Sequence, residues 1–338
     1  MPTTLVTGAT GFIAGHVIEE LLHHDYRVRA TVRSLRDPAR TAHLRTLAER
    51  TGGDLELVEA DLTDDAGWPE AVDGCSNVLH MASPFPATPP RDASSLVRPA
   101  VDGTLRVLAA SEAAGVGRVV VTSSIAAVST RSANDDDRVR DESDWTDPDQ
   151  APAYARSKTL AERAAWRFAQ DHPDLEVVAI NPGLVLGPIQ HTSAGTSVTI
   201  VRRLLGREVP AVPLMGFAPV DVRDLAVAHR RALEAPQAAG NRYICAGPNV
   251  WFGEMAQILR EEFGPLGYRV PTAQMPYWML WVLARFDGEV RLALDFVNRP
   301  EHLRADKAAS ELGLSMRPVR ETLVDTGRSL IRHGLVSA

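Results

Sequence analysis

The stretch Thr7-Gly8-Ala9-Thr10-Gly11-Phe12-Ile13-Ala14 decides the fold of this chain. It follows a short apolar run at 4–7 and opens a segment at 13–22 in which apolar residues recur every four positions. A strand, a glycine-rich turn and a helix in this order are typical of a dinucleotide site. The glycines let the backbone approach the pyrophosphate, and the helix N-terminus binds its charge. The expected cofactor contacts in this stretch are Thr7, Gly8, Thr10, Gly11, Phe12 and Ile13.

Apolar runs alternate with helical patterns through the first two thirds of the chain, as in strands that are joined by helices. Val119-Val120-Val121 and Val177-Val178-Ala179-Ile180 are almost continuously apolar, as expected for parallel strands that are covered on both faces. We therefore predict an α/β fold, a Rossmann-type doubly wound parallel sheet. The predicted strands are 4–7, 27–32, 55–60, 77–82, 118–123 and 176–181.

Beyond about Gly183 the pattern loosens, because several prolines interrupt it. The last part of the chain is mostly helical in pattern, apart from one apolar run at 242–245. We expect a smaller, mostly helical C-terminal substrate lobe. In this division residues 1–184 form the Rossmann domain, to which 217–246 return, and residues 185–216 and 247–338 form the substrate-binding lobe.

Composition excludes several classes of function. The 338 residues carry a net charge of −7 with dispersed basic residues, which argues against a nucleic-acid partner. Cys75 and Cys245 are far apart and lack metal-ligand spacing, so we expect no disulfide, no metal and a reducing compartment. The N-terminus leads directly into a predicted strand, without a signal peptide, and the apolar stretch 277–284 is too short to span a membrane. We expect a cytoplasmic protein with no membrane partner.

Helical spacing also suggests how two segments pack. Trp278 and Trp281 lie three positions apart, and we expect them in the core. Ser157, Ala161 and Ala165 share a helix face, where small residues permit either close packing within the chain or a helix-to-helix dimer, so the chain is expected to be a monomer or a homodimer. The histidines that we expect to be structural, because they lack partners at metal or triad spacing, are His16, His80, His191 and His229.

The residue after the second strand indicates which dinucleotide binds. A fold that prefers NAD usually carries Asp or Glu there for the ribose 2′-hydroxyl, whereas this chain has Arg33. A guanidinium binds a 2′-phosphate through charge-assisted hydrogen bonds, and Ser34, Arg36 and Arg40 follow closely. We therefore predict NADP(H). Asp61-Leu62, after the third strand, is expected to bracket the adenine ring.

A serine, a tyrosine and a lysine suggest carbonyl chemistry. Tyr154 and Lys158 are four apart on one helix face, and Ser123-Ser124 end a strand about thirty residues upstream. Carbonyl reduction needs a proton donor at the oxygen, and a phenol with a pKa of about 10 donates poorly near neutrality. A unit charge about 4 Å away contributes about 4 kcal/mol at an effective dielectric of about 20, enough for about three pKa units. We expect Lys158 to supply that charge and to bind the nicotinamide ribose.

These features together resemble the extended short-chain dehydrogenase/reductase superfamily. Within it, the chain is most similar to the group of dihydroflavonol reductases, cinnamoyl-CoA reductases and bacterial or yeast aldehyde/ketone reductases. The resemblance covers nearly the whole chain. Besides the opening stretch, the motifs that carry it are His80-Met81-Ala82-Ser83-Pro84, Val121-Thr122-Ser123-Ser124, Tyr154-Ala155-Arg156-Ser157-Lys158 and Asn181-Pro182-Gly183-Leu184-Val185-Leu186-Gly187-Pro188.

The resemblance implies roles for particular residues. Ser124 matches the catalytic serine, because it directly precedes a turn of small residues, and Tyr154 and Lys158 match the catalytic pair. Arg33 and Arg40 match residues that bind the 2′-phosphate. The further cofactor contacts that we expect, at the nicotinamide end, are Ala82, Ser83, Thr122, Pro182, Gly183, Leu184 and Val185.

At two places the sequence departs from the pattern of related families, which limits what the resemblance implies. Ser129 stands where flavonoid reductases carry an asparagine that binds the substrate, which argues against a flavonoid. No asparagine occurs at 99–104, in the helix after the fourth strand, so a four-member proton relay is not supported.

The segments expected to line the substrate pocket are apolar, so we predict a hydrophobic ketone or aldehyde that is reduced to an alcohol. The alternatives are an NAD-dependent nucleotide-sugar epimerase or dehydratase, a steroid dehydrogenase, and a dinucleotide-sensing regulator, which would typically lack the Tyr/Lys pair. The expected pocket residues are Pro84, Phe85, Ile125, Met215 and Phe217.

Overall fold

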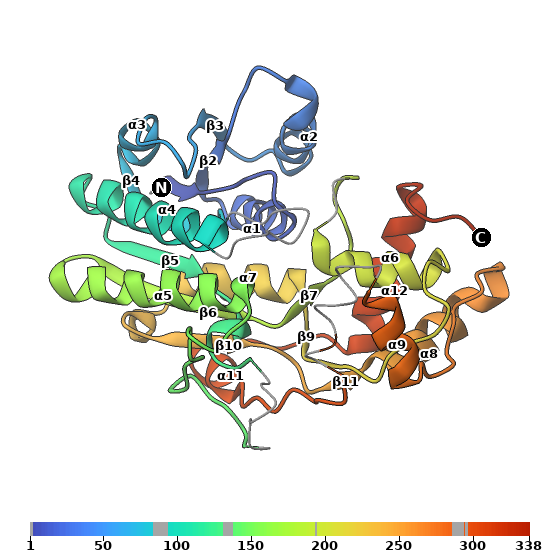
Figure 1. Ribbon diagram of the computed structural model, residues 1–338. Coiled ribbons are helices and arrows are strands. Elements are labelled where there is room, and N and C mark those ends of the chain that lie inside the picture. Colours follow the sequence, from blue (N-terminus) through green and yellow to red (C-terminus); the bar gives the residue numbers. More distant parts are fainter. Residues whose placement is uncertain (1–2, 84–93, 131–137, 193–194, 286–293, 295–296) are drawn as a thin grey trace.

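A sheet of seven parallel strands forms the centre of the protein (Figure 1). The computed structural model describes residues 3–83, 94–130, 138–192, 195–285, 294 and 297–338. The strand order is β10-β6-β5-β4-β1-β2-β3, so the chain winds outward from β1 in one direction and from β4 in the other. The strands are β1 (Thr3–Val6), β2 (Arg27–Val32), β3 (Leu55–Glu59), β4 (Cys75–His80), β5 (Arg118–Thr122), β6 (Glu176–Pro182) and β10 (Arg242–Cys245). The predicted doubly wound sheet is confirmed, with each strand end within two residues of its prediction.

Helices cover both faces of this sheet because its central strands are apolar on both sides. Val119 and Val120, which are adjacent in β5, are both fully buried and belong to different hydrophobic clusters on opposite faces. The helices on the first face are α1 (Phe12–His23), α2 (Ala42–Thr51), α7 (Val222–Glu234) and α11 (Asp306–Leu312). Those on the second face are α3 (Trp68–Val72), α4 (Ser94–Ala113) and α5 (Ala153–Asp171).

The winding order determines where a ligand site can form. β1 and β4 are neighbours, and the connections that leave them run to opposite sides of the sheet. Ligands bind in such sheets beyond the carboxyl ends of the strands, at the point where the winding reverses. The segments that follow β1, β4, β5 and β6 meet at this edge, and they contain most of the predicted site residues.

A separate hydrophobic cluster forms the smaller lobe, at the right of Figure 1. Helix α12 packs against α6 and α8 in this cluster. Two small sheets join the lobe to the carboxyl edge of the main sheet. The elements are β7 (Leu184–Leu186) paired with β9 (Pro219–Asp221), β8 (Gly216–Phe217) paired with β11 (Val250–Trp251), and α6 (Thr199–Leu205), α8 (Phe252–Phe263), α9 (Tyr277–Leu283) and α12 (Val319–Arg332).

Two packing predictions were wrong. We placed all of 247–338 in the substrate lobe, but α11 packs against β10 and α7 and buries Ala308 and Leu312 in the main core. Trp278 and Trp281 are 66% and 47% exposed rather than in the core. Short α9 contacts the lobe through Leu280 on its other side, which leaves the tryptophans on the outer side.

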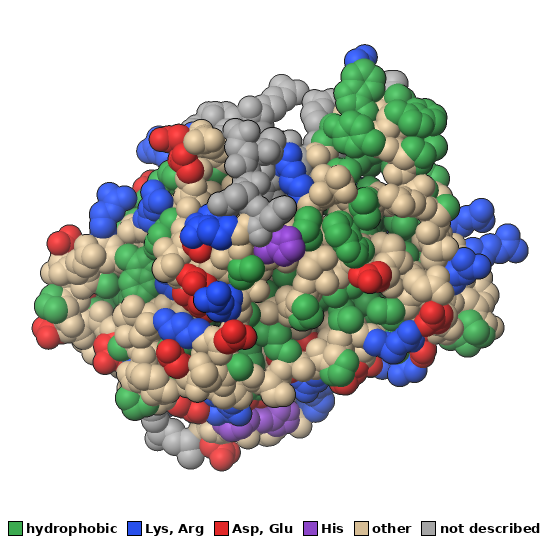
Figure 2. Space-filling view, turned by 90° about the horizontal axis from the view of Figure 1, so that it is seen from below, with side chains coloured by type: hydrophobic (Ala, Val, Ile, Leu, Met, Phe, Trp, Pro, Cys, Tyr) green, Lys and Arg blue, Asp and Glu red, His purple; other side chains and the backbone are tan. Residues whose placement is uncertain are grey.

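The small-residue face of α5 packs within the chain. Ser157, Ala161 and Ala165 are buried, and α4 lies side by side with α5 (Figure 1). Of the two alternatives, this packing favours the intrachain one for that face. Within the described ranges, no helix is both long and apolar enough to cross a membrane. On the face that Figure 2 shows, acidic and basic side chains are interspersed, and hydrophobic side chains gather on a projection at one edge.

Candidate active site

The glycine-rich turn after β1 leads directly into the N-terminus of α1, where an anion can bind. Gly8 has φ +70°, and a Cβ on it would lie 2.9 Å from the Cα of Ala82, so only glycine fits. Thr10 and Gly11 are exposed, and α1 begins at Phe12 without a side-chain cap on its first turn. The first amides of a helix have no intrahelical partner and favour negative charge. These residues therefore fit the pyrophosphate of a dinucleotide.

Thr7 shapes this turn from inside, although we expected it to contact the cofactor. Its side chain is fully buried, and its hydroxyl accepts hydrogen bonds from the amides of Met81 (3.0 Å) and Ala82 (2.9 Å). Its single hydroxyl proton then donates to Nδ1 of His80 at 3.0 Å, so Nε2 carries the ring proton and donates to Thr104 at 3.4 Å. Burial lowers the pKa of His80 to about 3, which keeps the ring neutral. Thr7 thus links the loops after β1 and β4.

The basic loop after β2 lies at the same edge. Arg33 is exposed, and Arg40 follows on a short 3-10 turn with its Nε 3.6 Å from a carboxylate oxygen of Asp37. The carboxylate of Asp61, beyond β3, accepts from the amide (2.8 Å) and hydroxyl (2.7 Å) of Thr63. These hydrogen bonds lower the pKa of Asp61, and the positive charge of Arg33 adds to the effect. Arg33 and Asp61 therefore lie near each other, where the adenosine end of a dinucleotide would bind.

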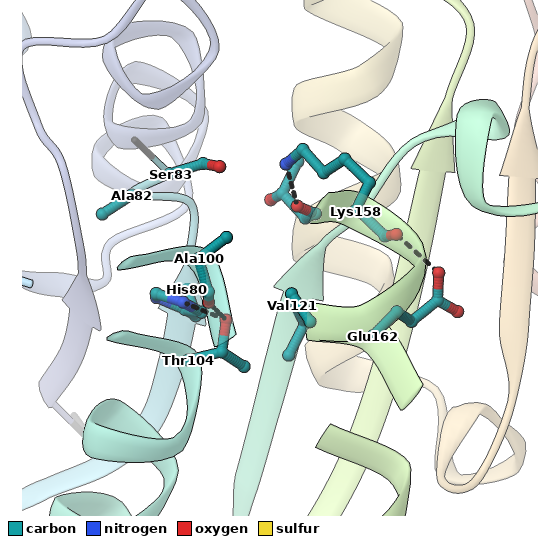
Figure 3. Close-up of a pocket in the computed structure, with 11 residues that line it drawn as sticks. His80, Ala82, Ser83, Ala100, Thr104, Val121, Lys158 and Glu162 are labelled. Atoms are coloured by element: carbon teal, nitrogen blue, oxygen red, sulfur yellow. Dashed lines mark hydrogen bonds between the residues drawn. The ribbon is translucent and has the colours of Figure 1, made fainter. Parts of the chain in front are cut away.

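Ser124, Tyr154 and Lys158 meet beyond the carboxyl end of β5. Ser124 caps a 3-10 turn at Ile125–Ala127, accepting from the amide of Ala126 at 3.2 Å, and is hydrogen-bonded to Tyr154. Tyr154 lies in the first turn of α5 and is 37% exposed. One turn further along α5, Nζ of Lys158 donates to the carbonyl oxygen of Thr122 at 3.2 Å (Figure 3). The structure thus brings together the three predicted catalytic residues.

The pKa of Tyr154 differs from our expectation. Burial raises it above the ordinary phenol value, and the hydrogen bond with Ser124 opposes the rise. We expected the Lys158 charge to lower it, but in this conformation the ammonium binds the carbonyl of Thr122. Burial lowers the pKa of Lys158 to about 8, while the negative charge of Glu162 raises it. The protonation of Lys158 therefore depends on two opposing influences, its burial and the negative charge of Glu162.

A small cavity of about 20 Å³ lies beside Lys158. Figure 3 shows His80 and Thr104 on one side of it and Lys158 and Glu162 on the other. Ala82 and Ser83 also line it, so the loop after β4 and the catalytic helix face the same space. A larger cavity of about 790 Å³, in the second lobe, shares no lining residue with it.

The turn at Pro182–Val185 passes from the main sheet into the lobe. The amide of Gly183 donates to the carbonyl of Cys245 (3.0 Å), and that of Leu184 donates to the carbonyl of Ala218 (2.9 Å). A Cβ on Gly183 would collide with the Ala218 carbonyl oxygen. Pro182 and Val185 are buried, whereas Gly183 and Leu184 are partly exposed. These two have surface available for a ligand.

The predicted pocket residues differ in accessibility. Ile125 is partly exposed and packs in a small cluster with Ala218. Phe217 is partly exposed and lies edge-on to Phe252, with ring centroids 5.9 Å apart. Met215 is 8% exposed, so it has little surface available for a ligand. The predicted residues Pro84 and Phe85 lie outside the described residues.

Several buried polar residues lie behind the catalytic group, and of these only His229 was expected, as a structural histidine. Nδ1 of His229 donates to the carbonyl of Leu225 (2.8 Å), so Nε2 accepts from the hydroxyl of Thr122 (2.8 Å). Glu162, four residues after Lys158, could have been noticed from its helical spacing. Arg242, its ion-pair partner at 2.6 Å, is 80 positions away and gave no local signal.

Comparison with known proteins shows the family of this chain. The model of the NAD dependent epimerase/dehydratase family matches residues 4–246. The chain belongs to this family. Cinnamoyl-CoA reductase 1 of Arabidopsis thaliana is 40% identical over 338 residues, which cover 98% of this chain and 90% of that protein. Cinnamoyl-CoA reductase 1 of Petunia hybrida is 36% identical over 336 residues, which cover 97% and 92%.

A solved structure of a reductase is also similar to this chain. Yeast methylglyoxal/isovaleraldehyde reductase Gre2, complexed with NADPH, superposes with a TM-score of 0.80 and 28% identity, over 99% of this chain and all of that one. The predicted resemblance to the extended short-chain dehydrogenase/reductases, and to their cinnamoyl-CoA and yeast reductase group, is confirmed.

Proposed function

We propose that this chain is an NADPH-dependent oxidoreductase that reduces the carbonyl group of a hydrophobic ketone or aldehyde to an alcohol. The observation that carries the proposal is the convergence of Ser124, Tyr154 and Lys158 at the edge where the glycine-rich turn also lies. The reductases named among the relatives, and the NADPH in the Gre2 structure, support it.

In this proposal each of the three catalytic side chains has a separate role in the reaction. Ser124 and Tyr154 are hydrogen-bonded to each other and hold the substrate oxygen between them. Tyr154 donates the proton as negative charge develops on that oxygen. Lys158 places a positive charge behind the phenol and binds the nicotinamide ribose. Bound NADPH supplies the hydride.

The cofactor would lie along the carboxyl edge of the sheet. The residues around Gly8, Thr10 and Gly11 hold the pyrophosphate, and Arg33 and Arg40 bind the 2′-phosphate. The fit rests on the close approach that Gly8 allows, the uncapped first turn of α1 and the exposed guanidinium of Arg33. The remaining proposed contacts, toward adenine and nicotinamide, are Asp61, Leu62, Ala82, Ser83, Thr122, Gly183 and Leu184.

Ile125 and Phe217 support a hydrophobic substrate, because both are apolar and partly exposed. We propose that they form one wall of the pocket. For the remaining properties we propose a cytoplasmic monomer or homodimer that acts on small molecules, not on nucleic acid. The two cysteines are free and buried, which is compatible with a reducing compartment.

The decisive experiment follows NADPH oxidation by the purified chain with a graded series of aldehydes and ketones. We expect turnover, with kcat/KM rising from small aliphatic to bulkier alkyl or aryl carbonyls, by at most about 0.8 kcal/mol, or roughly fourfold, per buried methylene. Parallel reactions contain nucleotide sugars or hydroxysteroids with NAD⁺. Activity confined to either would favour an epimerase, a dehydratase or a steroid dehydrogenase. Cofactor binding without turnover of any substrate would favour a regulator.

A further inference from the structure

Glu162 is a buried carboxylate one helical turn beyond Lys158. It is 1% exposed and accepts hydrogen bonds from the hydroxyl of Ser123 (2.5 Å), the amide group of Asn181 (2.8 Å) and Nε of Arg242 (2.6 Å). Because Asn181 and Arg242 can only donate through these nitrogens, the carboxylate accepts both hydrogen bonds. Figure 3 shows Glu162 beside the same small cavity as Lys158.

The partners of Glu162 come from three neighbouring strands and lead to the reacting groups. Ser123 directly precedes Ser124 at the end of β5. Asn181, near the end of β6, donates through its amide nitrogen both to Glu162 and to the carbonyl of Ser124 (3.1 Å). Movement of the Glu162 carboxylate would therefore displace Ser124 through two routes.

Arg242, at the start of β10, holds the carboxylate from the other side. It is 7% exposed and also donates to the carbonyls of Glu142 (2.9 Å) and Asp144 (2.6 Å). Its guanidinium stacks on the ring of Trp145 at 3.8 Å. The pair is thus fully hydrogen-bonded, which offsets the cost of burying two charges.

Within the part of the chain that the structure describes, few charged or titratable groups face Lys158. From α5 these are Tyr154 and Glu162, and from β4 it is His80, which is neutral because burial lowers its pKa to about 3. Arg242 of β10 reaches this region only through Glu162. Glu162 is therefore the anion that counteracts the burial of the Lys158 ammonium, and its negative charge raises the pKa of that group.

We propose that Glu162, held by Arg242, is a positioning residue that keeps Lys158 charged at working pH and holds Ser124 within reach of Tyr154. The proposal rests on the function given above. It also gives a role to the buried charges of Glu162 and Arg242, which lie behind the positively charged catalytic group of Ser124, Tyr154 and Lys158.

Four variants separate the charge from the anchoring. Glu162→Gln, and the double variant Glu162→Gln/Arg242→Met, remove the negative charge; the double variant leaves no unpaired charge and serves if the single one does not fold. Glu162→Asp keeps the charge but shortens the side chain, and Arg242→Met keeps the carboxylate. The matched control is Arg118→Met, because Arg118 is 8% exposed, pairs with Glu176 at 2.6 Å and binds three carbonyl groups at the opposite end of the sheet.

Two measurements are made on each folded variant. Competitive acetylation of Lys158, followed by peptide mass spectrometry across pH, reports its pKa without any substrate. The pH profile of kcat/KM for NADPH-dependent carbonyl reduction reports the effect on catalysis. Removing the Glu162 charge should lower the Lys158 pKa by on the order of one pH unit. The alkaline limb of the kcat/KM profile should shift to lower pH by a similar amount.

The other variants should behave differently. Arg242→Met should leave the Lys158 pKa unchanged or higher, because the carboxylate is no longer neutralised. Glu162→Asp should keep that pKa but lower kcat about tenfold, since Ser123 and Asn181 lose their anchor. Arg118→Met should lower Tm only. A wild-type Lys158 pKa in both Gln-containing variants would overturn the charge role, and wild-type kcat in Glu162→Asp would overturn the anchoring role. Because acetylation needs no turnover, a failure of the proposed function would show separately, as absent reductase activity.

Discussion

Tyr154 lies where its hydroxyl can serve both as a hydrogen-bond partner of Ser124 and as a proton donor to a substrate. It is 37% exposed, so a substrate can reach it, yet burial raises its pKa. A phenol with a raised pKa stays protonated near neutral pH, but it is a weaker acid and donates its proton less readily. At the level of single residues, proton donation by Tyr154 therefore depends on the positive charge that we propose for Lys158.

Tyr154→Phe tests this role directly. We expect kcat to fall by about 10²-fold or more, because the positioned proton donor is gone, while Tm and the Kd for NADPH change little. The matched control is Tyr26→Phe, which removes a surface hydroxyl that donates to Glu234 at 3.0 Å and should keep full activity. Near-normal turnover in Tyr154→Phe would contradict the assignment.

Arg33→Ala tests the choice of cofactor. A charge-assisted hydrogen bond contributes about 1.5–3 kcal/mol, so Arg33 should favour NADPH over NADH by roughly ten- to a hundredfold. The variant should raise KM for NADPH and leave NADH kinetics almost unchanged, and added salt should weaken the wild-type preference. Arg27→Ala, which breaks a surface pair with Asp54 at 3.0 Å, is the control. A wild type that prefers NADH would show that the basic loop has another role.

At the scale of elements, the site depends on how loops after different strands fit one another. The loops after β1 and β4 touch at Gly8 and Ala82 and are joined by Thr7. The first turn of α5 and the end of β5 meet through Tyr154 and Ser124. The carboxyl ends of these parallel strands lie at one edge of the sheet, so a change in one loop can act on its neighbour.

Gly8→Ala should destabilise the fold and the cofactor site together. Gly8 and Gly52 both have positive φ, +70° and +66°, but only Gly8 would place its Cβ against neighbouring backbone. Gly52→Ala should cost about 1–2 kcal/mol in the free energy of unfolding and leave NADPH binding unchanged. Gly8→Ala should cost more and weaken NADPH binding at least about tenfold, as measured by urea unfolding and fluorescence titration. Equal effects of the two substitutions would mean that the contact with Ala82 is unimportant.

At the scale of the whole molecule, two hydrophobic cores meet along the edge where the site lies. Phe12 packs against both cores, and β7 and β9 connect the sheet with the lobe. Buried histidines support this region: His80 lies behind the loop after β4, and His229 lies beneath Thr122. Both are neutral hydrogen-bonding groups, so the stability of the site region is linked to pH.

The free energy of unfolding should fall as pH drops. Burial lowers the folded-state pKa of His80 to about 3 and that of His229 to about 4, whereas an unfolded histidine titrates near 6.5. Below about pH 6.5 the unfolded chain binds more protons than the folded one. Each of these histidines therefore contributes a slope of up to about 1.4 kcal/mol per pH unit, down to its folded pKa.

Urea unfolding between about pH 7 and about pH 5 measures this slope. His229→Gln should flatten it, whereas His24→Gln should not, because the side chain of His24 is 43% exposed. A slope that is identical in wild type and His229→Gln would show that His229 is not buried as a neutral ring.

The sequence by itself determined the alternation of strands and helices, the glycine-rich turn, and the grouping of Ser124, Tyr154 and Lys158. Each of these depends on spacing within one element or on the order of neighbouring elements, which local patterns report. Only the tertiary structure decided that Arg242 of β10 pairs with Glu162 of α5, that α11 joins the main core and that Trp278 is exposed. These features follow from which surfaces meet across long stretches of chain. No local periodicity carries that information, because the same helix pattern can pack against several partners.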